Sequence, residues 1–352
     1  MGLPIIDINF KQLAKTASVR SQRGIVALIL KDTTKASLTV FDEGDIPAEL
    51  SEANKGFIKD VLKGNVNAPN KIEVYVLGSD DQISEALTYF EGVEFNLLCM
   101  PGAESDDITA IKTFIKKMNE VVKYKCDAIL ADTKADSEAI INYTAKNIVV
   151  GGETVTASNH VARIAGLIEG APLHQSITFA TLSDVDSIEN LTKEQADSRI
   201  DAGELILVRE MGKVRVARGV NSLTSLTDIK GNAFQKIKLR KTLNLIHNDL
   251  RRVIVEKYIG KVPNNYDNKC VLITEIKNYL DELEAEQLIE KVSYVGIDLE
   301  AHKKWIKDNT NLDVNSMTEQ EIKEANTQSN VFLAISLKTV DAIEDIKIAV
   351  EI

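Results

Sequence analysis

The sequence predicts a multidomain fold of mixed α/β and α+β class, and three observations lead to this prediction. The chain has 352 residues, and 44% of them are hydrophobic. This length exceeds the ~100–200 residues of a typical single domain. From residue 93, short apolar segments alternate with amphipathic helical segments, as expected for an α/β layer. After residue 226, two long amphipathic stretches precede the last strands.

Composition excludes several classes of protein. With 53 acidic and 42 basic residues the net charge is −11, which disfavours direct binding to nucleic acid. Cys99, Cys126 and Cys270 are widely spaced, so neither a disulfide framework nor a zinc site is expected. No secretory signal and no apolar run of ~20 residues is found, so we expect no stable membrane association. These features indicate synthesis in a reducing cytoplasm and release, if any, by lysis.

Residues 1–20 are predicted to form an N-terminal strand arm with a linker. Ile6, Ile8 and Phe10 occupy alternate positions, which lie on one face of a strand, and a polar stretch follows them. Residues 21–92 are predicted to form a small β-rich domain. Its expected elements are strands at 25–30 and 71–77, with a helix at 51–62 that begins at a capping Ser51.

Residues 93–225 are predicted to form an α/β domain, because strand and helix patterns alternate along it. A hairpin is expected around Met211-Gly212. The predicted strands are 95–100, 126–130 and 147–150, and the predicted helices are 106–123, 137–143, 156–169 and 194–202.

Residues 226–340 are predicted to form an α+β domain with long helices at 228–258 and 271–290 and a strand at 331–337. Residues 341–352 are predicted to form a C-terminal strand arm. Its residues 345–352 alternate strictly between apolar and other side chains. The apolar positions are Ile346, Ile348, Val350 and Ile352.

Sites for cofactors or catalysis are not apparent in the sequence. A phosphate-binding loop is missing, because no lysine stands at the required place after Gly151-Gly152. The four histidines have no metal-binding spacing. The basic residues of 236–252 form either a solvated helix face or a docking surface for an acidic partner. We therefore expect no catalytic residue, cofactor or metal.

The segment 215–224, Arg-Val-Ala-Arg-Gly-Val-Asn-Ser-Leu-Thr, resembles the signature of the contractile tail sheath family. Its turn consists of Arg218, Gly219, Val220 and Asn221. The order of the segments at 258–265 and 271–288 and of the terminal strand is similar to that family's C-terminal domain. The opening residues 2–10 and 20–24 are similar to short sheath proteins of defective prophages and of R-type bacteriocins, such as diffocins, from Gram-positive bacteria. The resemblance covers almost the whole chain.

This resemblance implies a structural subunit, not an enzyme. It would polymerise helically around an inner tail tube and contract, with baseplate and terminator or collar proteins as further partners, in a virion or phage-tail-like particle. The middle domain would have a subtilisin-like topology without the catalytic triad, since His160 lacks the surrounding glycine-rich turn. The terminal arms would pair with neighbouring subunits. A tube-facing surface is expected in the C-terminal domain, at residues drawn from Lys236, Lys238, Arg240, Lys303 and Lys304.

The sequence allows two other interpretations. An α/β enzyme would place Gly151-Gly152 near its cleft and would need a convergent group of titratable residues, which the sequence does not offer. An inner tube protein or other baseplate component is the second alternative. Tube proteins of this kind are shorter and mostly β, whereas several long helices are predicted here.

Overall fold

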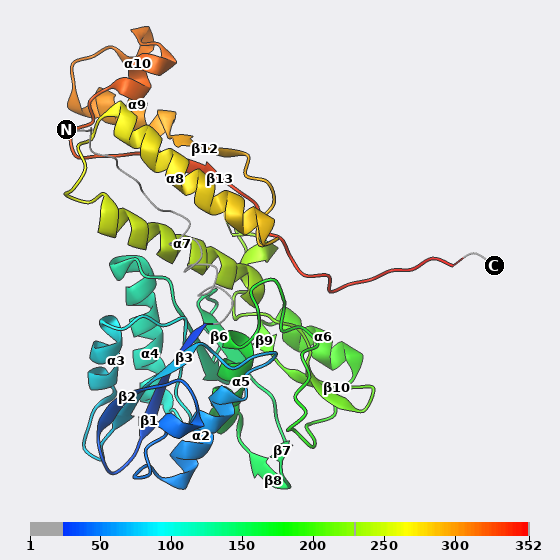
Figure 1. The fold of residues 1–352 in the computed structure, drawn as a ribbon. Coiled ribbons are helices and arrows are strands. Elements are labelled where there is room, and N and C mark those ends of the chain that lie inside the picture. Colours follow the sequence, from blue (N-terminus) through cyan, green and yellow to red (C-terminus); the bar gives the residue numbers. More distant parts are fainter. Residues whose placement is uncertain (1–23, 229, 351–352) are drawn as a thin grey trace, which may run out of the picture. The chain divides into compact units, whose positions relative to one another are not determined.

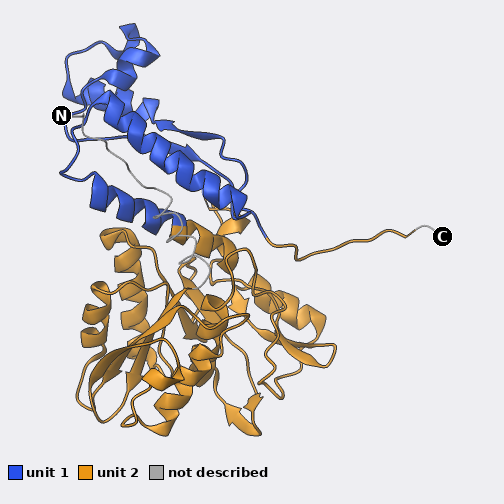
Figure 2. Cartoon of the chain, viewed as in Figure 1, with its two compact units in different colours: residues 1–18, 246–341 blue, residues 19–245, 342–352 orange. Residues whose placement is uncertain are grey.

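The computed structural model describes residues 24–228 and 230–350. They form two compact units, coloured separately in Figure 2. Unit 2 includes the described parts of 19–245 and 342–352, and unit 1 includes residues 246–341. The chain passes from unit 2 to unit 1 within helix α7 (Ile237–Lys257) and returns to unit 2 at residue 342.

Unit 2 is built on a seven-stranded sheet with the order β2-β3-β1-β4-β5-β6-β9 (Figure 1). Strand β2 runs antiparallel to β3, and all other neighbouring pairs are parallel. The strands are β1 (Ile25–Lys31), β2 (Ala36–Val40), β3 (Lys71–Leu77), β4 (Leu97–Cys99), β5 (Asp127–Ala131), β6 (Ile140–Tyr143) and β9 (Glu204–Leu205).

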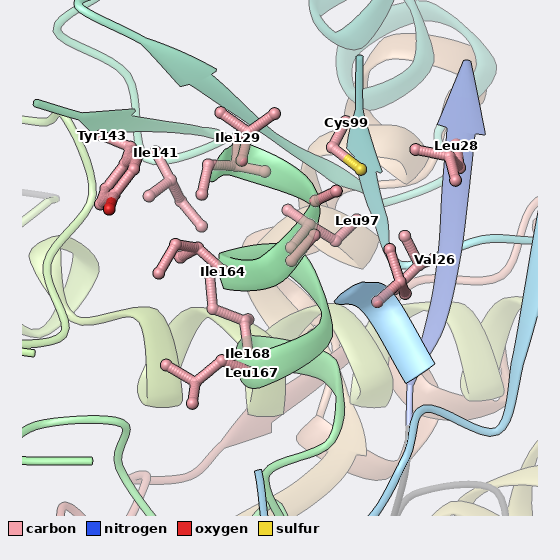
Figure 3. Packing of buried hydrophobic residues seen from close by; sticks show 14 of the residues in the cluster. Val26, Leu28, Leu97, Cys99, Ile129, Ile141, Tyr143, Ile164, Leu167 and Ile168 are labelled. Atoms are coloured by element: carbon pink, nitrogen blue, oxygen red, sulfur yellow. The ribbon is translucent and has the colours of Figure 1, made fainter. Parts of the chain in front are cut away.

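The central strands are apolar on both faces, because helices cover the sheet on both sides. In β1, Val26 and Leu28 belong to one buried cluster, whereas Ala27 and Ile29 belong to the other. This alternation is the period-two pattern of a strand. Figure 3 shows side chains of the first cluster on the sheet beside those of helix α5 (Ala157–Glu169).

Helices α5 and α2 (Glu52–Leu62) pack together on the first face of the sheet. Gly166 permits this packing, since a Cβ there would lie 2.2 Å from the carbonyl oxygen of Val61. The second face is covered by α3 (Ile83–Glu91) and α4 (Ser105–Lys117), and a π-helical turn (Met118–Val122) follows α4. The predicted cap at Ser51 is confirmed, because its side chain accepts from the amide of Asn54.

Smaller elements complete unit 2. They are helix α6 (Lys193–Asp201) and two antiparallel ribbons. One ribbon pairs β7 (Ile148–Val150) with β8 (Glu153–Val155), and the other pairs β10 (Leu207–Glu210) with β11 (Lys213–Val216). The second ribbon confirms the predicted hairpin around Met211-Gly212. The short helical turns are η1 (Glu43–Asp45) and η3 (Asn232–Gln235).

Unit 1 consists of helices and one small sheet. The last part of α7 bonds to α8 (Tyr266–Ala285), since the Tyr279 hydroxyl donates to Asp249 at 3.0 Å. Strands β12 (Tyr294–Ile297) and β13 (Leu333–Ser336) form an antiparallel pair. Between them lie α9 (Leu299–Asn309), a 3-10 turn (Val314–Ser316) and α10 (Glu319–Glu324). In the described residues, no helix combines the length and the apolar character needed to span a membrane.

Several predictions of elements and boundaries are wrong. The small β-rich domain over 21–92 does not exist separately, because β1 and β3 lie inside the large sheet. The predicted helix over 137–143 contains strand β6, and the predicted helix from residue 228 begins only at Ile237. The two compact units divide at 245/246, within α7.

Of the two predicted terminal arms, only the C-terminal one lies partly within the described residues. No strand is assigned to residues 340–350, so the predicted strand at 345–352 is not formed within the described part of this single chain. In the described part of the chain no strand pairs with residues 345–350, and a strand needs such a neighbour to satisfy its backbone groups. The N-terminal arm with Ile6, Ile8 and Phe10 lies outside the described residues, as does Ile352.

Candidate functional site: the signature turn and the C-terminal arm

The signature turn follows β11 and lies within unit 2. Gly219 is its most constrained residue, because a Cβ there would lie 2.9 Å from Cγ1 of Ile177 and 3.4 Å from Oγ of Ser176. Its amide donates to Oγ1 of Thr178 at 3.0 Å. Its carbonyl accepts from the amide of Ile237 at 3.0 Å. Gly219 therefore joins the 176–178 loop to the start of α7.

The residues after Gly219 hold the turn to the rest of unit 2. Asn221 is 1% exposed, and its side chain donates to the carbonyl of Phe234 at 2.7 Å and accepts from the amide of Leu223. Ser222 donates to the carbonyl of Ser137 at 3.0 Å. Val220 forms an isolated bridge with Lys236. Asn221 and its neighbours thus have a structural role, and Arg218 is the residue of the turn with a charged, partly exposed side chain.

The beginning of the C-terminal arm (residues 341–352) binds beside this turn. Oε1 of Glu344 accepts from the Ser176 hydroxyl at 2.9 Å and from the Thr178 hydroxyl at 2.7 Å. Its Oε2 accepts from Nζ of Lys236 at 3.0 Å. Asp345 accepts from Arg218 at 2.7 Å. Two consecutive carboxylates of the arm are therefore held by four side chains of unit 2.

The environment of Glu344 favours its charged form. The side chain is only 5% exposed, and burial alone would raise the pKa of its carboxyl group. The hydrogen bonds from Thr178, Lys236 and Ser176 outweigh burial, so the pKa is lowered. This carboxylate is ionised near neutral pH and is bound as an anion.

Residues 346–350, the described part of the arm beyond Asp345, contain no helix or strand, as Figure 1 shows. Ile346, Ile348 and Val350 are 74%, 80% and 76% exposed. Such a row of exposed apolar side chains on alternate positions is unusual for a soluble monomer and marks a site of interaction.

The structure corrects part of the predicted basic surface. Lys238 and Arg240 are 5% and 6% exposed, so they are not part of a solvated docking face. Arg240 is buried because it pairs with the buried Asp127 at 3.1 Å. Lys236 is largely engaged with Glu344. Lys303 and Lys304 lie on α9 in unit 1, where Lys303 pairs with Glu300 and Lys304 is exposed.

The geometry gives no support to the enzyme interpretation. In open α/β sheets, ligands bind beyond the carboxyl ends of the strands, where the strand order reverses. Here that place lies between β1 and β4. Lys31 and Asp107 form an ion pair there at 2.9 Å, and the amide of Glu104 also donates to Asp107. The Asp107 carboxylate at this position is thus occupied by Lys31 and by the start of α4.

His160 and a surface groove offer no catalytic constellation either. His160 is 3% exposed, and its Nδ1 lies 2.7 Å from the Tyr143 hydroxyl. Burial lowers the pKa of His160 to about 4. An open groove of about 550 Å³ lies between α3 and α4. Of its charged residues, Glu91 and Lys117 pair with each other, and the third is Asp106. In the described residues no group of three or more potential metal ligands is found.

Comparison with known proteins identifies the family. The chain is 48% identical to the tail sheath protein of Clostridium phage phiCD119 over 355 aligned positions, which cover 99% of both proteins. The chain belongs to the phage tail sheath protein family. Residues 79–222 match the phage tail sheath protein central domain, and residues 230–352 match the phage tail sheath C-terminal domain. The phage-like element PBSX protein XkdK of Bacillus subtilis is 27% identical over 78% of this sheath chain and 59% of its own length.

Solved structures share the fold. The sheath tail protein Lin1278 of Listeria innocua matches with a TM-score of 0.72 and 19% identity, over 85% of this sheath chain and 94% of that protein. The helical sheath of the anti-feeding prophage in its contracted state matches with a TM-score of 0.67 and 14% identity, over 99% and 98% of the two chains. The resemblance stated from the sequence is confirmed.

Sequence reasoning found the turn and the arm but missed the contact between them. The sequence alone does not single out Ser176, Thr178 or Glu344. The one local signal was the acidic pair 344–345 directly before the alternating apolar residues. A contact over 168 residues, such as that of Ser176 with Glu344, leaves no periodicity in a single sequence.

Proposed function

We propose that this chain is the structural subunit of a contractile tail sheath. It polymerises helically around an inner tube, and contraction drives the tube through a bacterial envelope. The observation that carries this proposal is the C-terminal arm, which presents Ile346, Ile348 and Val350 to solvent although their alternation suits a strand. Such a segment gains its hydrogen bonds and burial by adding to a sheet edge of another chain.

The energetics explain why the arm stays unpaired in one subunit and pairs in an assembly. Burial of these three side chains contributes roughly 5–9 kcal/mol. Ordering the five residues 346–350 costs roughly 5–10 kcal/mol. For one arm, the free energy gained by burial is therefore close to the cost of ordering the chain. Many subunits arranged on a common tube raise the effective concentration of each arm and shift this balance towards pairing.

Edges that could accept an arm exist in the described part of the chain. Strand β2 ends the large sheet, and both strands of the β12–β13 pair have a free side. A contact between different surfaces of identical subunits does not close on itself unless the rotation allows it, so it generates a helix. The N-terminal arm with Ile6, Ile8 and Phe10 is proposed to pair with a neighbour in the same way.

Several finer features belong to the same proposal. The subunit acts without catalysis or cofactor, is assembled in the bacterial cytoplasm and is released by lysis within a phage or phage-tail-like particle. Its partners are the inner tube, the baseplate and the terminator or collar proteins. A subtilisin-like topology of the sheet is supported by the strand order and by helices on both faces.

The tube-facing surface is proposed to lie on α9, since Lys238 and Arg240 are buried. Lys304 and Lys307 are exposed there, beside Trp305. Lys304→Glu with Lys307→Glu is expected to leave purified subunits folded and able to form cylinders, but to abolish sheaths around tubes. Sheaths of normal length on tubes would exclude this surface.

The test of the function is negative-stain electron microscopy of the full chain expressed alone. We expect hollow cylinders, because arm exchange needs only copies of the same chain. Ile346→Asp with Ile348→Asp should leave a folded subunit that forms none. The matched control is Lys347→Asp. It makes the same change of about two charge units, but on the opposite face of the strand. Long cylinders from the double variant would refute the arm proposal.

A further inference from the structure

The first residues of the C-terminal arm are fixed differently from the rest of it. Before the arm, the amide of Val340 donates to the carbonyl of Leu288 at 3.0 Å in unit 1. Ile343 is 86% exposed. Glu344 and Asp345 are then bound by unit 2, and the exposed apolar residues follow immediately. The position at which the arm becomes free is therefore set by this acidic pair.

We infer that unit 2 carries a binding site for the dipeptide Glu344-Asp345, which fixes the root of the arm on its own subunit. We call this site the arm anchor, and it is made of Ser176, Thr178, Arg218 and Lys236. The inference rests on the proposed function only in assuming that the free part of the arm reaches another chain.

The chemistry of the arm anchor suits an anion that is partly removed from water. Glu344 receives two hydroxyl donors and one ammonium group, so both of its oxygens are satisfied. A buried carboxylate without such partners would be costly. Asp345 is 76% exposed, and Arg218 binds it at the rim of the site. Glu344 therefore provides most of the binding, and Asp345 sets the direction in which the chain leaves.

The signature turn organises this anchor. The Gly219 amide donates to Oγ1 of Thr178, which leaves the hydroxyl proton of Thr178 for Glu344. A side chain at residue 219 would displace Ile177 or Ser176. Arg218, next to this glycine, binds Asp345. The turn thus positions the side chains that bind the arm. Glycine is required at residue 219 because of this close packing and not because of a left-handed φ.

Anchoring limits where the exposed apolar residues can bind. Residues 346–350 span at most about 18 Å when fully extended. A neighbour's edge that pairs with them must therefore lie within that distance of Asp345. A short tether with a fixed root also raises the effective concentration of the arm at a correctly placed edge.

The anchor can be tested in a single chain by pulsed electron resonance between two nitroxide labels. Met211→Cys and Ile343→Cys place both labels on exposed sites of unit 2, 89% and 86% exposed, with Cys270→Ser removing the one native thiol that is not buried. Labelled chain is diluted in excess unlabelled chain, so only distances within one chain are read. We expect one narrow distance distribution.

Glu344→Ala and Lys236→Met should each replace the narrow distribution by a broad one. Arg218→Glu should broaden it as well, and Arg218→Glu combined with Asp345→Arg should restore it. Glu49→Ala, at an exposed acidic residue elsewhere in unit 2, is the control and should change nothing. A broad distribution in the unmodified arm, or a narrow one in Glu344→Ala, would overturn the inference.

The assembly assay separates this inference from the proposed function. Glu344→Ala should raise the critical concentration for cylinders by at least about twofold, because the tether becomes longer and less directed. An unchanged critical concentration would show that the anchor does not serve assembly. A narrow distance distribution in a chain that never forms cylinders would retain the anchor and refute the sheath function.

Discussion

The pKa of His160 is strongly affected by burial in the interior of unit 2. His160 lies on α5 at the interface with the sheet, and its Nδ1 forms a hydrogen bond with the Tyr143 hydroxyl at 2.7 Å. Burial lowers its pKa from 6.5 to about 4, so the folded state holds the neutral ring. In the unfolded chain the same ring takes up a proton below about pH 6.5.

Unit 2 is therefore expected to lose stability in mild acid. A group whose pKa is depressed by folding contributes fully above its unfolded pKa, and the contribution declines as pH falls towards the folded value. The loss for His160 should accumulate between pH ~6.5 and ~4 and approach roughly 3 kcal/mol. Hydrogen exchange of β6 amides in wild type and in His160→Gln measures it. Identical pH profiles of the two proteins would contradict this expectation.

Single residues were predictable only where a local rule applied. Outside the site, the cap at Ser51 is an example, because helix caps have a local signature. The signature turn was found by resemblance, and the close approach that requires Gly219 could not be known before Ile177 and Ser176 were placed against it. The basic residues 238 and 240 were misassigned, since charge alone does not reveal a buried partner such as Asp127.

Among the elements, the first two turns of α7 are fixed to the sheet by a buried polar network. Arg240 donates to Asp127 at 3.1 Å and to Asn119 at 2.8 Å, and Asn244 donates to Asp127 at 2.9 Å. Arg240 and Asp127 are 8% and 9% exposed at their side chains. The helix is thus attached by charges that have little access to water.

Removal of one partner of this pair should be severe. Arg240→Met leaves Asp127 buried without its counter-charge, which costs about 3–5 kcal/mol. The additional change Asp127→Asn should recover much of this loss. Lys193→Met is the control, because it breaks an exposed pair with Asp197 on α6 and should cost below about 1 kcal/mol. Urea unfolding followed by circular dichroism compares them, and equal costs for the two single variants would exclude the network as the attachment of α7.

The elements themselves were predicted well where burial gives a clear period. Strands β1, β3 and β5 and helices α2, α4 and α5 lie close to their predicted ranges. The pattern of residues 137–143 predicts a helix, yet Ile140–Tyr143 is a parallel strand between β5 and β9. Pairing with the neighbouring strands determines the structure of this segment and overrides its local preference. The single large sheet was missed for a similar reason, since the pairing of β1 with β4 is not encoded locally.

For the whole molecule, the net charge of −11 opposes the assembly that the arms promote. Each added subunit brings the same excess of acidic residues close to its neighbours. Repulsion between exposed charges acts over a Debye length, which falls from ~30 Å at 0.01 M salt to ~10 Å at 0.1 M. Burial of the apolar residues of the arm does not weaken over this range of salt.

Salt should therefore promote polymerisation of the purified chain. Between 10 and 150 mM sodium chloride we expect the critical concentration for cylinders, measured by sedimentation, to fall severalfold. An uncharged osmolyte at equal osmolality serves as the control and should have a much smaller effect. If salt instead dissolved the cylinders, attractive charge pairs between subunits would dominate the interface, and exposed residues such as Lys304 would become the first candidates for those pairs.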